Sequence, residues 1–264
     1  MNDWPIIKQF VSILSYAVRG LYILLQNMGI ESVVVTIAVF AVITKLCLFP
    51  ILYKQQELPF LRNIAKKDID KINSTLKDDK AKLSIETFRV YSKYGIANNT
   101  GCLLSIFQII DLIALYSIVF DAAKYIPEAA NNSNAFVFFG LDMNTAPEIG
   151  SITTLIIPFI AVITQFISTF QINYYNSGRK NIGFLNIYSS GITLIFSLQL
   201  PCIIAFYWSV QAIVTIIENL IIRTILNNRG PEKAMLLHLQ KLNKSRTKRE
   251  LSEITIFDLQ GTQS

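Results

Sequence analysis

Residues 33–53 read VVVTIAVFAVITKLCLFPILY, and this stretch decides the class of the protein. It is apolar except for Thr36, Thr44 and Lys45, and a helix needs roughly 20 such residues to cross the hydrocarbon core of a bilayer. The rest of the chain agrees, since 52% of its 264 residues are hydrophobic and only 16% are charged, against about 25% charged in soluble domains. The sequence therefore predicts an all-α integral membrane protein.

Three further apolar blocks follow this stretch, at 102–120, 152–174 and 184–226. The last block is too long for a single crossing at about 1.5 Å per residue, and Pro201 lies near its middle. We interpret it as two crossings joined by a tight turn at the proline. The prediction is therefore five transmembrane helices.

The segment before the first crossing has a different pattern. Lys8, Ser12, Ser15 and Arg19 recur at helical spacing along one face, and the opposite face is apolar. Basic residues on the polar face are typical of a helix that lies in the membrane interface. We predict such an amphipathic helix within residues 1–30. The alternative is a sixth crossing or an uncleaved signal peptide, which would place the arginine deep in the bilayer.

The charges between the apolar blocks predict the orientation. Lysine and arginine are abundant in 54–98, in the link 175–183 and in the tail 227–264, whereas 121–151 is mostly acidic. Five crossings place the basic segments on one side of the membrane and the acidic loop on the other. The positive-inside rule assigns the basic side to the cytoplasm. We therefore expect the N terminus outside and the C terminus in the cytoplasm.

The large basic loop contains two further helical patterns, at 55–72 and 81–93, separated by Asp78 and Asp79. We predict a mobile helical hairpin there. The predicted organisation is an interfacial helix (1–30), a first transmembrane helix (31–53), a cytoplasmic helical hairpin (54–98), transmembrane helices two to five with an outside loop near 121–151 (99–226), and a basic cytoplasmic tail (227–264).

Charged residues inside the predicted crossings are candidates for function. Lys45 lies well inside the first crossing, where a charge costs about 2.5–3.5 kcal/mol and therefore usually faces protein or water. The alternative is that its long side chain reaches the nearby cytoplasmic interface. Asp111 and Glu218 are the acidic residues available in other crossings. A lysine–carboxylate pair that holds the helices together is the alternative to an open charged cavity.

Neutral polar residues also occur within the crossings. Thr44, Gln108, Gln165 and Gln211 are each most simply explained as hydrogen-bonding partners between helices. Together with Lys45 they could instead line a wet cavity.

No catalytic or metal-binding set is expected. His238 is the only histidine, and Cys47, Cys102 and Cys202 have neither CxxC spacing nor a histidine partner. The chain contains no Walker, GxGxxG or HExxH pattern. We expect no enzymatic activity, no cofactor and no metal.

Four stretches together carry a resemblance to a known family. They are ITKLCLFP (43–50), VYSKYGI (90–96) followed by GCL (101–103) and Gln108, FFGLD (138–142), and Leu200-Pro201 followed by FYWSV (206–210). In this order and topology they resemble the YidC insertases of bacteria, relatives of the mitochondrial oxidase-assembly and thylakoid insertases. The family typically has arginine where this chain has Lys45.

The resemblance implies a membrane protein insertase of the bacterial cell membrane that works without nucleotide hydrolysis. It implies a polar groove open to the cytoplasm and to lipid, in which the positive charge attracts acidic substrate tails. The predicted lining of this groove is Lys45, Thr44, Gln108, Gln211, Asp111 and Glu218.

The expected partners are nascent membrane proteins, with the Sec translocon as a further candidate. Ribosomal RNA and anionic lipids fit the basic tail equally well. The rival hypotheses are a small transporter or channel subunit with an intramembrane charged site, and an assembly factor without insertase activity.

Overall fold

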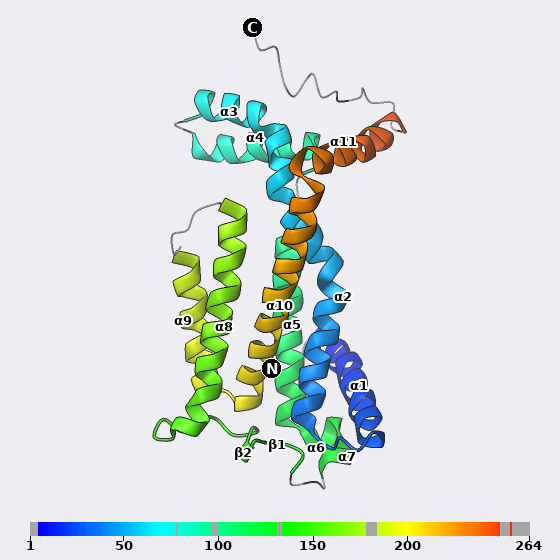
Figure 1. Cartoon of the computed structure of the whole chain (residues 1–264), viewed down its shortest axis with the longest axis vertical. Helices are drawn as coiled ribbons and strands as arrows, with labels where there is room; N and C mark the ends of the chain where they lie inside the picture. The colour runs from blue at the N-terminus through cyan, green and yellow to red at the C-terminus, as the bar shows by residue number, and fades with distance from the viewer. Residues whose placement is uncertain are drawn as a thin grey trace. The chain divides into compact units, whose positions relative to one another are not determined.

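The computed structural model describes residues 5–77, 79–96, 100–130, 132, 134–177, 184–248 and 254. The chain forms two compact units, the first made of Met1–Phe49 and Cys102–Asn219 and the second of Pro50–Gly101 and Leu220–Ser264. Figure 1 shows that the described chain is mostly helical. The helical part of the predicted fold class is therefore confirmed.

Six long helices contain the apolar blocks and the N-terminal segment. They are α1 (Pro5–Asn27), α2 (Val33–Leu61), α5 (Thr100–Phe120), α8 (Ile152–Ser177), α9 (Phe184–Gln199) and α10 (Cys202–Arg229). Within the described residues, α2, α8 and α10 are each long and apolar enough to cross a membrane, and α5 has a shorter apolar stretch at Gln108–Phe120. The count of five crossings stays a prediction.

Prolines have different effects in these helices. The predicted break in the last apolar block is confirmed, because α9 ends at Gln199 and α10 begins at Cys202, with Pro201 between them. By contrast, α8 continues through Pro158, and α2 continues past Pro50 to Leu61. A proline removes one backbone hydrogen bond, which neighbouring groups can compensate in a membrane helix.

The largest hydrophobic core lies in the first unit and joins α1, α2, α5 and α10. It includes Tyr22 of α1, Ile37 of α2, Leu115 of α5 and Ile203 of α10, all fully or almost fully buried. In the part of α2 that belongs to the first unit, Val33–Phe49, the last buried residue is Ala41, and every residue from position 42 to 49 is half-buried or exposed. The core therefore ends one turn before Lys45.

The N-terminal helix α1 contacts this core with a face that the sequence pattern did not indicate. Val11, Ser15, Val18 and Tyr22 share the buried face, whereas Ile13 on the predicted apolar face is exposed. Residues spaced at three and four lie on one side of a helix, and here that side packs against protein. The interfacial position of α1 stays a prediction.

Between α5 and α8, the loop carries four short elements. These are α6 (Ala122–Tyr125), α7 (Pro127–Ala130), β1 (Val137–Phe138) and β2 (Leu141–Asp142). The two strands pair antiparallel, with Phe138 opposite Leu141, and were not predicted from the sequence. Backbone bonds attach this loop to the start of α10, because Cys202 N donates to Thr145 O at 2.9 Å and Ile203 N to Met143 O at 2.8 Å.

The second unit contains a helical hairpin made of α3 (Lys66–Thr75) and α4 (Lys80–Lys93), which lie side by side in Figure 1. Asp79 caps α4, since its carboxylate accepts a hydrogen bond from Lys82 N at 3.0 Å. The predicted single helix at 55–72 is wrong, because α2 supplies its first part and a short 3-10 turn at Arg62–Ala65 precedes α3. Asp78 lies outside the described residues.

The hairpin base packs against α11 (Pro231–Thr247), which forms most of the described tail. His238 Nε2 lies 2.9 Å from Tyr94 O, and the Tyr94 hydroxyl donates to Asp68 at 2.9 Å. Ile85 and Phe88 of α4 are exposed. The mobility of the hairpin stays a prediction. Arg249 of the basic run and both basic residues of the predicted link, Arg179 and Lys180, lie outside the described residues.

Candidate functional site

Three helices of the first unit bring polar residues together beyond the end of the hydrophobic core. Lys45 comes from α2, Asp111 from α5, and Gln211 and Glu218 from α10. Gln211 and Glu218 are seven positions apart, about two helical turns, so both lie on the inner face of α10, where both are buried. Four of the six predicted site residues therefore belong to one region.

Asp111 is the centre of a hydrogen-bonded group between α5 and α10. Its carboxylate accepts a hydrogen bond from the Tyr207 hydroxyl and another from Gln211 Nε2 at 3.3 Å. Gln211 Nε2 also donates to the Tyr207 oxygen. Tyr207 and Gln211 are both buried and lie one turn apart on α10. These three residues form a carboxylate–phenol–amide triad.

Lys45 does not form the ion pair that was the structural alternative. In the part of the chain that the structure describes, no carboxylate oxygen lies within 4.0 Å of its ammonium nitrogen. The charge is nevertheless within electrostatic range of Glu218 and Asp111, and the side chain is half-buried. The ammonium group therefore faces two carboxylates without being neutralised by direct contact with either.

Glu218 is the most deeply buried acid of this region, with 3% of its surface exposed. Its Oε1 has no hydrogen-bond partner among the described residues. A buried acceptor without a partner is costly and calls for an explanation in any native structure.

The other two predicted site residues do not join this group. The Thr44 hydroxyl donates to Ala41 O of its own helix at 2.9 Å and is half-buried. Gln108 is exposed, three positions before Asp111 on α5. Thr44 is adjacent to Lys45 in sequence and Gln108 lies about one turn before Asp111, but within the described chain neither side chain hydrogen-bonds to a member of the charged region.

Gln165 hydrogen-bonds Thr169 within α8 at 3.2 Å. Asn173 of α8 donates to Asn186 of α9, and Asn219 of α10 donates to Gln171 of α8 at 3.4 Å. Figure 1 shows α8 and α9 side by side. Asn173 and Asn219 thus connect neighbouring helices, whereas Gln165 was expected to do so and bonds within its own helix instead.

Tyr207 was not predicted as a site residue. It occurs in the aromatic motif FYWSV, where it was noted only as part of a family pattern. The signal that could have identified it is its spacing of four from Gln211, which places the two polar groups on one helical face. The identity of its acidic partner on α5 requires the tertiary structure.

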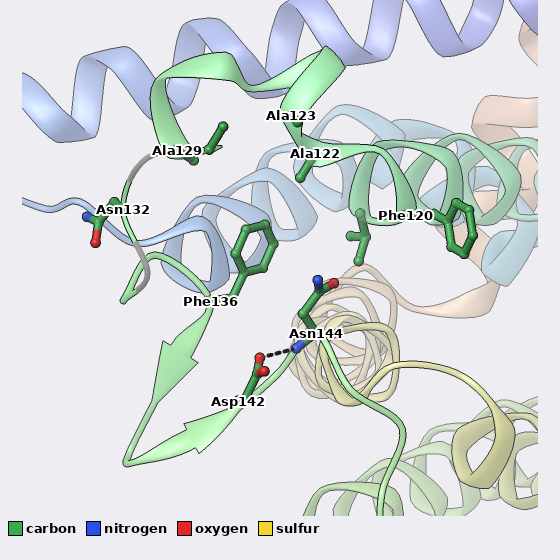
Figure 2. Close-up of a pocket in the computed structure, with 10 residues that line it drawn as sticks. Phe120, Ala122, Ala123, Ala129, Asn132, Phe136, Asp142 and Asn144 are labelled. Atoms are coloured by element: carbon green, nitrogen blue, oxygen red, sulfur yellow. Dashed lines mark hydrogen bonds between the residues drawn. The ribbon is translucent and has the colours of Figure 1, made fainter.

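A separate pocket of about 390 Å³ lies in the loop between α5 and α8. Figure 2 shows Phe136, Asn144 and the alanines of α6 and α7 around it, with Asp142 bonded to the backbone of Asn144. Its lining contains none of the predicted site residues. It is therefore distinct from the charged region of α2, α5 and α10.

Comparisons with known proteins find similarity to one family of membrane proteins and to relatives named as insertases. A family model described as "60Kd inner membrane protein" matches residues 24–229. A membrane protein insertase YidC of Clostridium perfringens is 23% identical over 223 residues, covering 81% of this chain and 88% of the relative. Membrane protein insertase YidC 1 of Listeria monocytogenes is 24% identical, covering 77% and 68%. The YidC insertase of Aquifex aeolicus is 25% identical, covering 85% and 41%.

Proposed function

The chain belongs to the 60Kd inner membrane protein family, and on that premise we propose that it is a membrane protein insertase. Relatives named as YidC insertases support this role. The observation that carries the mechanism is the half-buried Lys45 beside two carboxylates and without an ion pair among the described residues. The names of these relatives give no support to a transporter or channel subunit.

We propose that Lys45, Thr44, Gln108, Gln211, Asp111 and Glu218 line a polar groove. The groove lowers the free energy of moving a short polar tail partway across the bilayer, because its polar groups replace part of the water that the tail loses. Two observations support an opening of the groove near Lys45. The residues of α2 just after Ala41 are not buried, and Gln108 of α5 is exposed. The apolar helix of the substrate then partitions into lipid, which supplies the driving force.

In this mechanism the triad of Asp111, Tyr207 and Gln211 has a positioning role. Two hydrogen bonds hold the Asp111 carboxylate toward α10, so that the carboxylate does not form an ion pair with Lys45. The positive charge stays available to an acidic substrate tail. The unpartnered Oε1 of Glu218 offers an acceptor for a backbone N–H of a polypeptide in the groove.

The proposed topology has five crossings, with the N terminus outside and the C terminus in the cytoplasm of a bacterial cell. Nascent membrane proteins are the substrates. We propose the ribosome or anionic lipids as partners of the basic residues of α11 and the tail, and the Sec translocon as a further partner. Lys244 and Arg246 in the last turn of α11 support the basic character of this segment.

The test is insertion by the purified full chain in proteoliposomes. Two single-span substrates differ only in the short tail to be translocated, which is acidic in one and neutral in the other. Protease protection of the tail measures insertion. Because the proposed attraction depends on charge, Lys45→Arg should retain insertion of both substrates. Lys45→Gln should impair insertion of the acidic tail more than that of the neutral tail.

Two controls make this test decisive. Lys8→Gln removes an exposed lysine of α1 and should leave both substrates unaffected. The double variant Lys45→Gln with Glu218→Gln removes the charge together with an acidic neighbour. If the double variant has normal abundance and inserts acidic tails fully, the lysine is structural and the mechanism is wrong.

A further inference from the structure

Phe139 occupies an unusual position at the tip of the β1–β2 hairpin. Its exposed fraction, 91%, is the largest among the exposed large hydrophobic residues in the described parts of the chain. A phenylalanine that projects this far carries a large apolar surface with no protein contact to cover most of it. The residue therefore contributes little to the folded core.

The backbone at this tip is also strained. Phe139 has a φ of 50° and Gly140 a φ of 78°, and Phe139 is the one non-glycine residue with positive φ in the described chain. Positive φ at both central residues is the signature of the turn that favours Asn-Gly and Gly-Gly. Phenylalanine is disfavoured there because positive φ brings its Cβ into steric conflict with the backbone. Strained residues of this kind concentrate at functional positions.

The base of the hairpin is attached to a membrane-spanning helix. The Phe138 ring lies 5.2 Å from the Phe206 ring of α10, and the Phe139 ring lies 4.5 Å from the Phe138 ring. Phe206 is four residues inside α10, about 6 Å along its axis. The hairpin is therefore held level with the first turns of an apolar helix.

Other exposed apolar residues occur at the same ends of neighbouring helices. Phe120 is the last residue of α5 and Ile152 the first of α8, and both are largely exposed, as is Ile149 just before α8. From Ile152 an exposed apolar face continues along α8. Figure 2 shows that the turn of the hairpin points away from the pocket beside it. The surface of a membrane-embedded helix thus continues toward the hairpin.

We propose that the β1–β2 hairpin is a membrane anchor whose Phe139 inserts into lipid at the boundary between headgroups and acyl chains. Aromatic side chains are favoured at this depth. The loop that carries the hairpin is mainly acidic, with Asp121, Glu128, Asp142 and Glu148 against the single base Lys124, so it disfavours anionic headgroups. The lipid that suits this site is zwitterionic, with an ammonium group in its headgroup.

Tryptophan fluorescence in proteoliposomes tests this inference. Phe139→Trp and, as a matched control, Asn134→Trp are made in the full chain with Trp4 and Trp208 replaced by Phe. Asn134 is exposed in the same loop. In phosphatidylethanolamine vesicles, lipid with brominated acyl chains should quench the Trp at position 139 and aqueous iodide should not. The control position should show the reverse.

Two results would overturn the proposal. Equal quenching by iodide at both positions would place the tip in water, and protection of position 139 from both quenchers would mean that protein covers it. The preference for zwitterionic lipid is tested by raising the phosphatidylglycerol content of the vesicles, which should reduce quenching by brominated lipid at position 139.

Phe139→Asn separates anchoring from folding, because asparagine tolerates positive φ. Its thermal midpoint should equal or exceed that of the natural chain. Amide hydrogen exchange over 137–142 should become faster in vesicles, because the lipid contact is lost. Unchanged exchange in this well-folded variant would contradict the anchor.

Discussion

At the scale of single residues, the polar groups of α2, α5 and α10 differ in how completely they are satisfied. Asp111 has two donors from α10, whereas Glu218 Oε1 has none in the described chain. An acid that accepts from two donors stabilises the contact between its two helices, while an orphan acceptor costs free energy. In the proposed mechanism, Asp111 is therefore a structural element of the site and Glu218 is available to a polypeptide in the groove.

Tyr207→Phe tests the structural element. The change removes the hydroxyl that donates to Asp111 and accepts from Gln211, and it leaves a half-buried carboxylate short of a partner. We expect a loss of about 1–3 kcal/mol in stability, seen as a lower thermal midpoint of the purified protein. Tyr16→Phe, at an exposed position of α1, should leave the midpoint unchanged. Equal midpoints for the two variants would show that the triad contributes nothing.

At the scale of elements, an ion pair joins α1 to α7. Arg19 Nε lies 2.9 Å and 3.1 Å from the two Glu128 carboxylate oxygens. These hydrogen bonds, assisted by the arginine charge, hold the pKa of the Glu128 carboxyl below its ordinary value. Such a group stabilises the contact at pH values above its ordinary pKa of about 4.3. The stabilisation is lost as the pH falls through the lowered pKa.

We therefore expect the contact between α1 and α7 to loosen in acid. The distance between spin labels at Ser12 and Ala130, both exposed, should be well defined at neutral pH and broaden below about pH 4. Salt should weaken the contact as well, since both side chains are partly exposed. With Glu128→Gln the distance should be broad at every pH. Acid broadening that persists unchanged in that variant would assign the effect to another group.

The junction between the hairpin and α11 depends on a glycine. Gly95 has a φ of +64°, and a Cβ there would lie 3.1 Å from Leu242 Cδ1 and 3.7 Å from His238 Nε2. Gly95→Ala therefore adds backbone strain and a close contact, together about 1–3 kcal/mol.

Gly29→Ala is the matched control, because Gly29 also has positive φ and ends its helix with the same pair of backbone hydrogen bonds, but no atom lies within 4 Å of the added Cβ. Thermal unfolding should show a larger loss for Gly95→Ala than for Gly29→Ala. An equal loss would mean that Leu242 moves aside without cost and that only the backbone matters.

At the scale of the whole molecule, the charge distribution makes the orientation testable. The acidic loop and the basic segments should lie on opposite sides of the membrane. Single cysteines at Asn132, Lys80 and Ser245 can be tested in intact cells with a reagent that does not cross the membrane. We expect labelling at Asn132 alone, with all three labelled after the membrane is opened. Labelling of Ser245 in intact cells would refute the proposed orientation.

The sequence by itself determined the membrane class, the helical break at Pro201 and the family. These follow from local properties, namely the length of apolar runs, the missing N–H of a proline and short ordered motifs. It also identified Lys45, Asp111, Gln211 and Glu218 as the polar residues of interest, because polar groups are rare and conspicuous in apolar helices.

Only the tertiary structure decided which of these residues are partners. Asp111 bonds to Tyr207 and Gln211, about a hundred positions away in the chain, while Lys45 contacts no carboxylate in the described residues. The buried face of α1 and the strained tip at Phe139 also came from the structure. Pairing between helices depends on their rotation and depth relative to one another, and periodicity within one helix does not contain that information.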